Sequence, residues 1–497
     1  MNLSPNIFFH ILLPPIILDS AYTLYDGDFL NVVFATLSYA ILGTISNFVL
    51  ILSAFMMMLK IGYIELEGAD IGFCRLISSI IIAVDPVAVL AIFNQAKVNK
   101  MLYFLIFGES LFNDAISVTL YEIVKHYTKD QFNFIDFLLC FIAFFVISFG
   151  GLVIGLVYGL VSSIISRVEY DSEIIVQMLV PICAYYSAMF FGWSGIVALI
   201  GCGLMQMSYA FKNMKPKSIY MIRSIVGDLA KTAEGIIFLF LGKEMPGCFA
   251  NIGKHIKLFG SFILIVFSSR ILTISCLTPI LNALQFDFHF ISFKEGIILV
   301  YGGLRGAISY SLANMVNEKN FPVNGKELQE IMKDLTLFTI LFTIVFFGVT
   351  LPVLMKLLRI ESKKPESLSL FSEINSEANR IILQGVEAIC GIKGRNIIIK
   401  NFISAERKYI SNYLLLERRK KRIRILEVLE QIQLKSIDRD PKIKKIARNR
   451  LLTTQSNISQ LIQRIDPNIV IIPNLNDFSK YSLEHSFGRT KKSFVNS

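Results

Sequence analysis

Eleven stretches of this chain are apolar over a length that can cross a lipid bilayer. A membrane-spanning helix needs about 20 mainly apolar residues, because each backbone polar group must be bonded within the helix. A mean hydropathy of +0.58 over 497 residues is typical of a polytopic membrane protein. The apolar stretches lie near residues 7–24, 31–59, 71–93, 101–124, 134–165, 174–192, 194–210, 219–242, 256–282, 294–315 and 335–358. We therefore expect an all-α membrane protein with about 11 transmembrane helices.

Positive charge is concentrated at the end of the chain. Of the 49 Lys and Arg residues 27 lie from Arg359 onward, together with 14 of the 38 Asp and Glu residues. Basic segments that follow a membrane span tend to stay in the cytoplasm. We predict a transmembrane domain at residues 1–358 and a cytoplasmic tail at residues 359–497. Eleven crossings then place Met1 on the outside.

The fourth apolar stretch carries polar side chains near the middle of the membrane. Glu109, Ser110, Asn113 and Asp114 stand at i, i+1, i+4 and i+5, so they share about a third of the helix circumference. A charged residue at this depth costs about 3 kcal/mol or more. The stripe favours a functional site beside an aqueous cavity. A polar patch that only joins neighbouring helices is the alternative.

Two further spans contain an interruption. In residues 83–88, Pro86 lacks a backbone N–H and disfavours a helical conformation at Asp85. Residues 301–307 contain three glycines around Arg305. Interrupted spans in corresponding positions are typical of inverted-repeat transporters, whose ion site lies at the crossing. We expect the freed carbonyls beside Asp85 to be cation ligands, with a simple proline kink as the alternative.

Four segments resemble the eukaryotic sodium/proton exchangers, and specifically their plasma-membrane branch. The likeness runs in order from about Phe8 to about Leu415, and the segments are residues 12–19, 84–90, 107–115 and 301–308. The resemblance implies an inverted-repeat antiporter fold with two discontinuous helices. It also implies electroneutral exchange of sodium or potassium for protons, which regulates cell pH and volume, in a homodimeric transporter that is not an enzyme and needs no cofactor.

The resemblance implies that Asp114 binds the transported sodium ion or a proton. Asn113 would act with it as an Asn-Asp pair. Ser110, Asp85 and the backbone of Val84 would be the neighbouring ligands.

The resemblance implies three other groups of residues. Glu109 and Arg270 would form a structural ion pair inside the membrane. Asp19 and Glu234 would lie near the outer cavity, where guanidine inhibitors of the amiloride class bind in the family. The second discontinuous helix would be centred on Gly302, Gly303 and Arg305.

The chain departs from the family at its start. Family members have two spans before the Leu-Pro-Pro motif, whereas Met1 precedes Leu13 by about a dozen residues here. We expect either a truncated gene model or a reduced exchanger without those spans. Two other functions stay open, which are an inactive exchanger that acts as a regulatory or scaffold membrane protein and a cation channel with this fold.

The tail is expected to bind partners. Apolar residues recur at helical spacing between Phe371 and Ile389, which predicts an amphipathic helix at about residues 370–390. This helix resembles the one that binds the EF-hand calcineurin B homologous protein in the family, and packing on the membrane domain is the alternative. The basic cluster at residues 418–424 suits anionic lipid or a calmodulin-like protein, or is a solvated helix face. Nucleic acid is not expected as a partner, and little order is expected from Asp466 onward.

Overall fold

The computed structural model describes residues 4–25, 29, 32–62, 70–85, 89, 93, 98–126, 134–168, 172–252, 256–284, 291–316, 325–358 and 412–415. All of them belong to a compact unit that ends at Leu416. The amphipathic helix predicted at residues 370–390 and the basic cluster at residues 418–424 lie outside the described residues, and the domain boundary at residue 358 stays a prediction.

The described residues are helical apart from short connections and one isolated bridge. The first part contains α1 (Pro5–Ile7), η1 (Phe8–Leu12), α2 (Leu13–Leu24), α3 (Val33–Ser38), η3 (Tyr39–Gly43), α4 (Thr44–Lys60), α5 (Ile71–Ile81) and α7 (Lys100–His126). The middle part contains α8 (Phe134–Ile165), α9 (Glu173–Phe190), α10 (Gly195–Met205), η4 (Gln206–Ala210), α11 (Phe211–Asn213) and α12 (Pro216–Ile252). The last part contains α13 (Ile256–Leu284), α14 (Phe293–Tyr301), α15 (Ala307–Met315), α16 (Gly325–Phe342), η6 (Thr343–Phe347), α17 (Gly348–Leu357) and the short α20 (Asn412–Leu414).

Eight helical runs among the described residues are long and apolar enough to cross a membrane. The helix α5 is shorter, and α14 and α15 are the two halves of one interrupted span. The long helix α12 carries several ionisable residues in its middle, which lowers its hydropathy. The predicted all-α membrane fold with two discontinuous helices is confirmed, while the count of eleven crossings stays a prediction.

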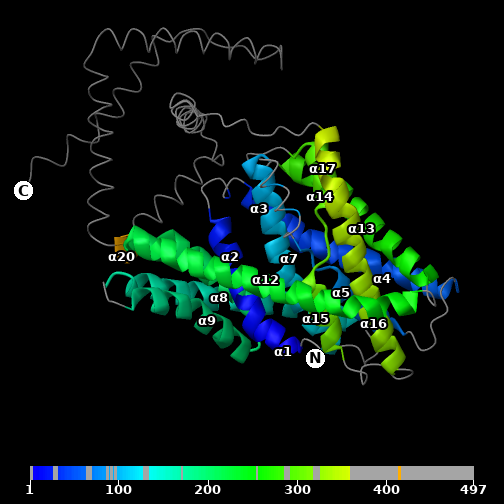
Figure 1. Ribbon diagram of the computed structural model, residues 1–497, viewed down its shortest axis with the longest axis horizontal. Coiled ribbons are helices and arrows are strands. Elements are labelled where there is room, and N and C mark those ends of the chain that lie inside the picture. Colours follow the sequence, from blue (N-terminus) through cyan, green and yellow to red (C-terminus); the bar gives the residue numbers. More distant parts are fainter. Residues whose placement is uncertain are drawn as a thin grey trace, which may run out of the picture. The chain divides into compact units, whose positions relative to one another are not determined.

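The helices form two groups. We call α2, α8, α9, α10 and α11 the side bundle, because these helices pack on one another or continue from one another. We call α4, α5, α7 and α13 to α17 the crossing bundle, for the crossing described below. Figure 1 shows α8 and α9 on one side and α4, α13 and α16 on the other, with α12 running across. The helix α12 packs on α2 and α9 as well as on α15 and α16, so it joins the two bundles.

Small residues set the close packing of the side bundle. Gly151, Gly155 and Gly159 recur every four residues along α8 and face α10 and the residue that caps it. A Cβ atom at Gly155 would collide with the backbone of Ala198. Helices approach this closely in membranes through small residues, because packing rather than water exclusion drives their association.

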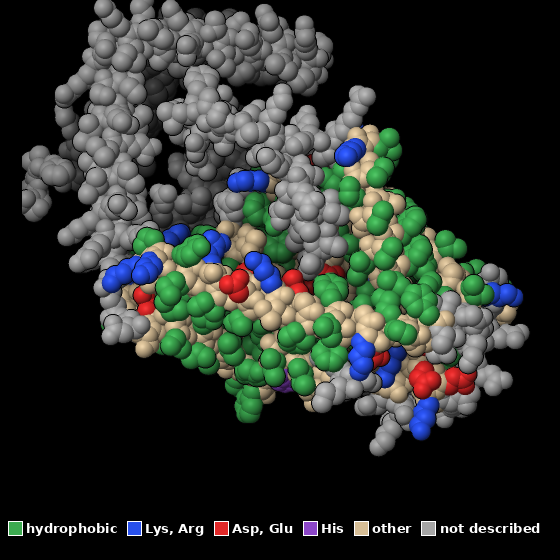
Figure 2. Space-filling view, viewed as in Figure 1, with side chains coloured by type: hydrophobic (Ala, Val, Ile, Leu, Met, Phe, Trp, Pro, Cys, Tyr) green, Lys and Arg blue, Asp and Glu red, His purple; other side chains and the backbone are tan. Residues whose placement is uncertain are grey.

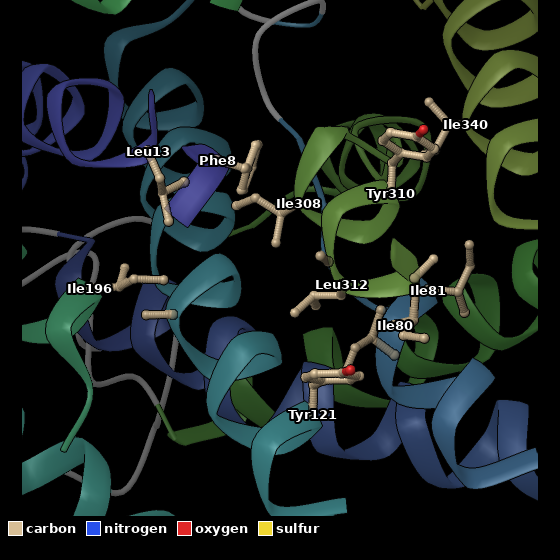
Figure 3. Packing of buried hydrophobic residues seen from close by; sticks show 14 of the residues in the cluster. Phe8, Leu13, Ile80, Ile81, Tyr121, Ile196, Ile308, Tyr310, Leu312 and Ile340 are labelled. Atoms are coloured by element: carbon tan, nitrogen blue, oxygen red, sulfur yellow. The ribbon is translucent and has the colours of Figure 1, made fainter. Parts of the chain in front are cut away.

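The outer surface and the interior are both apolar. In Figure 2 hydrophobic side chains cover most of the described part of the visible face, as expected of a surface that lies in lipid. Figure 3 shows Ile308 and Leu312 projecting from α15 between Phe8 on one side and Ile80 and Ile81 on the other. This apolar packing connects the start of the chain to the two interrupted spans, and so fixes the position of the crossing.

Candidate functional site

The two interrupted spans meet at a crossing of extended backbone. Val84 and Arg305 form an antiparallel bridge, and the backbone N–H of Asp85 donates to the carbonyl of Leu304 at 2.8 Å. Gly306 lies directly against this contact, and a Cβ atom there would collide with the side chain of Asp85. The glycine therefore permits the close approach of the two strands.

Side chains bond the backbone carbonyls that are freed where the span at residues 71–93 is interrupted. The carbonyl of Ile82 accepts from Asn113 Nδ2 at 3.1 Å and from Arg305 Nη1 at 3.2 Å. The carbonyl of Val84 accepts a short hydrogen bond from Ser110 Oγ. A buried backbone carbonyl without such a donor would be costly inside a membrane. These bonds hold the broken end of α5 to α7 and to the second interrupted span, and a role for Val84 as a cation ligand stays a prediction.

Both the nitrogen and the oxygen of the Asn113 side-chain amide have hydrogen-bond partners. Its nitrogen faces the carbonyl of Ile82, which can only accept, so its oxygen Oδ1 faces Thr44 and lies 2.9 Å from Thr44 Oγ1. The carbonyl of Ala40 lies 2.5 Å from the same Oγ1, so the two oxygens compete for the one hydroxyl proton of Thr44. Asn113 is buried and is not among the described residues that line the cavity beside it. Nothing in the sequence marks Thr44 as part of the site, because threonine is common in transmembrane helices and gives no signal by itself.

A cavity of about 420 Å³ lies next to the crossing. Its walls come from α2, α7, α12 and the two extended segments, and they include four carboxylates and one ammonium group. These side chains are Asp19, Asp85, Asp114, Glu234 and Lys231. A concave site in which negative groups outnumber positive ones raises the local concentration of cations.

Asp114 lines this cavity and is 8% exposed. Its position on α7, near the middle of the helix, agrees with the stripe seen in the sequence. Ser110, one turn earlier, points to the crossing through its bond to Val84. The structure thus brings Asp114 and Asp85 to one cavity, whereas it turns Asn113 and Ser110 toward the backbone of the interrupted span.

Asp19 and Glu234 lie on the walls of the same cavity as Asp114. Asp19 comes from α2 and Glu234 from α12. Thr23 and Tyr103, near the ends of their helices, also line the cavity. The role of Asp19 and Glu234 in inhibitor binding stays a prediction.

Glu109 and Arg270 are an ion pair behind the crossing. Arg270 Nη2 lies 2.6 Å from Glu109 Oε1 and also donates to the carbonyl of Leu299 at 3.2 Å. Both side chains are at least 95% buried. Gly303 stands against this pair, because a Cβ atom there would lie 3.0 Å from Arg270 Nε. Two buried opposite charges at this distance contribute no net charge to the cavity.

Arg305 provides a further positive charge inside the crossing. Its side chain is 1% exposed, and its guanidinium donates to the carbonyl of Ile82 at the end of α5. The backbone N–H of Arg305 donates to Thr343 Oγ1 at 3.2 Å. A cation at the carboxyl end of a helix interacts favourably with the helix dipole. The second discontinuous helix therefore bonds to the first one through both its backbone and its charge. In the segment before Arg305, Gly302 contributes its N–H to the carbonyl of Ile298 at 2.7 Å and ends α14.

Comparisons with known proteins agree with this arrangement. The model of the family described as sodium/hydrogen exchanger, transmembrane, matches residues 2–357. The chain is 32% identical over 419 residues to the Na(+)/H(+) exchanger protein 7 of Caenorhabditis elegans, a match that covers 82% of this chain and 52% of that protein. It is 32% identical over 440 residues to the Na(+)/H(+) exchanger beta of Oncorhynchus mykiss, covering 87% of this chain and 56% of that protein. The chain spans about half the length of the curated relatives it matches.

A solved structure has the same fold. The sodium proton antiporter MjNhaP1 of Methanocaldococcus jannaschii is similar with a TM-score of 0.53 at 20% sequence identity. The match covers 71% of this chain and 86% of the antiporter chain. This likeness extends to the arrangement of helices in the membrane.

Proposed function

Because this chain belongs to the sodium/hydrogen exchanger family, we propose that it is an electroneutral antiporter, which carries protons out of the cytoplasm in exchange for sodium or potassium. The observation that carries the proposal is the position of Asp114, a buried carboxylate at a cavity beside two crossed, discontinuous helices. Broken helices at membrane depth are tolerated where they are packed in protein or line a cavity, and both conditions are met.

One carboxylate can account for the coupling. Asp114 holds either a proton or a partly dehydrated cation, so the two substrates compete for the same oxygens. Asp85 lines the same cavity and is the proposed second ligand. The Glu109–Arg270 pair is neutral in sum, so that one positive charge moves in each direction.

We propose that movement of the two bundles against each other opens the site to one side of the membrane and then to the other. Alternating access in inverted-repeat transporters is largely a rigid-body movement of one bundle against another. The crossing bundle contains Asp114 and both discontinuous helices, whereas the side bundle and α12 contribute the opposite cavity wall with Asp19 and Glu234. Relative movement of the bundles would expose the cavity first on one side and then on the other.

The finer location and the partners are part of the same proposal. We assign the protein to the plasma membrane with a cytoplasmic C-terminus, on the basis of the basic tail and of the resemblance. The helix at residues 370–390 would bind an EF-hand calcineurin B homologous protein. The basic cluster at residues 418–424 would bind anionic lipid or a calmodulin-like protein, and a homodimer would be the working assembly.

The first test is the substitution Asp114→Asn, which preserves shape and removes the proposed carrier. The control is Glu122→Gln on the same helix, which removes a half-exposed carboxylate beside Lys125, 3.7 Å away. Sodium-dependent pH recovery after an acid load is measured in cells without other exchangers, and surface expression is measured in parallel. We expect recovery at background rate for Asp114→Asn and at wild-type rate for Glu122→Gln. Wild-type recovery in Asp114→Asn would contradict the assignment of the site.

A further inference from the structure

A short part of the tail, residues 412–415, lies against the membrane domain. It forms the single turn α20 and packs on α8. Leu414 and Leu415 are each 5% exposed, whereas Tyr413 is 73% exposed. In Figure 1 α20 lies at the end of the described part where α12 begins. The segment therefore has one face buried on the domain and one face free.

Two side chains of the domain hold this segment by its backbone. Asn213 Nδ2 donates to the carbonyl of Leu414 at 2.8 Å, and Arg167 Nη1 donates to the carbonyl of Tyr413 at 3.0 Å. Both carbonyls stand at the carboxyl end of α20, where a helix leaves its carbonyls without internal partners. Basic and amide side chains commonly bond such carbonyls.

The donors are themselves fixed in position. Asn213 Nδ2 also lies 3.0 Å from Ser166 Oγ and 3.3 Å from the carbonyl of Ser163. Asn213 ends α11, and Arg167 follows the end of α8, so the two donors come from separate elements of the side bundle. Two elements that are far apart in the sequence therefore bond two consecutive carbonyls. This arrangement holds a backbone segment at that place.

We propose that Arg167 and Asn213 form a clasp, which anchors the tail of this chain to the side bundle at residues 412–415. The last described helix before residue 359 is α17, which belongs to the crossing bundle. Residues 359–411 therefore connect the crossing bundle to a fixed point on the side bundle. The clasp uses none of the residues that line the cavity, so it does not depend on which ion is transported.

A consequence for exchange follows, and this consequence rests on the proposed function. If the two bundles move against each other during transport, the connection at residues 359–411 is attached to both moving parts. A partner that shortens or stiffens this connection would change the equilibrium between the two arrangements of the bundles, provided that the clasp holds.

The clasp is tested by thiol labelling of the purified full-length protein. Leu414→Cys places a thiol on the buried face of the segment, and Tyr413→Cys places one on the exposed face of the same turn. Labelling by a maleimide is followed at the peptide that contains the introduced cysteine, by mass spectrometry, so that native cysteines do not interfere. We expect the cysteine at position 414 to react at least about tenfold more slowly than the one at position 413. Equal rates in the folded protein would overturn the clasp.

A second pair of variants assigns the protection to the two donors. Adding Arg167→Ala and Asn213→Ala to Leu414→Cys removes both hydrogen bonds, and we expect the labelling rate to rise about tenfold. The control Lys212→Ala removes the side chain next to Asn213, whose ammonium lies 3.5 Å from Tyr25 Oη, and should leave the cysteine at position 414 protected. A protected cysteine in the double-alanine background would refute the role of Arg167 and Asn213.

Exchange is measured on the same variants. We expect the cytoplasmic pH of half-maximal exchange to shift in the double-alanine variant and to stay unchanged in Lys212→Ala. Release of the segment without such a shift would overturn the consequence for exchange. Absence of exchange in the wild-type chain would count against the proposed function, whereas the labelling result would still decide the clasp.

Discussion

At the scale of single residues, the ion pair of Glu109 and Arg270 makes a direct prediction. Neutralising either residue leaves its partner as an unpaired charge in the membrane, which costs about 3 to 5 kcal/mol. Glu109→Gln or Arg270→Gln alone should therefore lose surface expression and exchange. The double variant should be less damaged than the worse single variant, as measured by both quantities. Losses that add strictly would show that the two charges do not support each other.

Thr44 is predicted to orient the amide of Asn113. Thr44→Val keeps the shape and removes the hydroxyl that Asn113 Oδ1 shares with the carbonyl of Ala40, a loss of about 1 to 3 kcal/mol. We expect the exchange rate to fall by about tenfold with normal surface expression, and Thr44→Ser to restore it. The control is Thr36→Val, because Thr36 is also buried and its hydroxyl bonds the carbonyl of Val32 in its own helix. Equal effects of the two valine variants would contradict an orienting role for Thr44.

The chemistry of the site could be predicted from the sequence where charge lies deep in an apolar span. Asp114, Glu109 and Arg270 are costly in lipid, so their presence alone indicates a partner or a cavity. The turn of Asn113 toward Ile82 could not be predicted, because a polar amide fits a cation and a backbone carbonyl equally well. Its direction depends on where the broken end of another helix lies.

At the scale of elements, the crossing of the two discontinuous helices depends on Gly306. Gly306→Ala places a Cβ atom into the side chain of Asp85, so the two extended segments must separate. We expect loss of exchange with partial loss of stability. Gly296→Ala in α14 is the control, because nothing lies within 4 Å of a Cβ atom there and alanine favours a helix. The exchange rates of the two alanine variants are measured and normalised to surface expression. Full activity of Gly306→Ala would contradict the prediction that exchange requires the close contact at Gly306.

The interruptions themselves follow from local residue types, whereas their pairing does not. Pro86 and the glycines of residues 302–306 each predict a break in their own span. The bridge between Val84 and Arg305 joins segments far apart in the chain, which the packing of α15 on α5 brings together. Two helices also continue beyond the predicted apolar spans, where polar residues extend them. The helix α12 continues to Ile252, beyond the predicted end at residue 242, and α16 begins at Gly325 rather than near residue 335. Hydropathy marks the part of a helix that lies in lipid, not the part that continues into water.

At the scale of the whole molecule, the arrangement separates the proposed carrier carboxylate from the buried ion pair. Asp114 and Asp85 line the cavity, while Glu109 and Arg270 neutralise each other behind it. Another part of the wall comes from the side bundle and α12, so that the proposed movement between bundles would change access to the cavity without breaking the buried pair. The sequence indicated a membrane antiporter, but the grouping of helices into two bundles depends on packing between distant spans, such as α8 on α10, which no local pattern specifies.

Exchange in reconstituted vesicles under an imposed membrane potential tests the central claim most directly. The purified full-length chain is placed in liposomes, and proton movement driven by a sodium gradient is recorded at potentials of either sign, with Asp114→Asn as the control. One net charge moved per cycle would change the driving force by about 2.3 kcal/mol per 100 mV. We predict proton movement that depends on sodium and on Asp114 and does not change with potential. Sodium-dependent current, or proton movement that persists in Asp114→Asn, would contradict electroneutral exchange at this site.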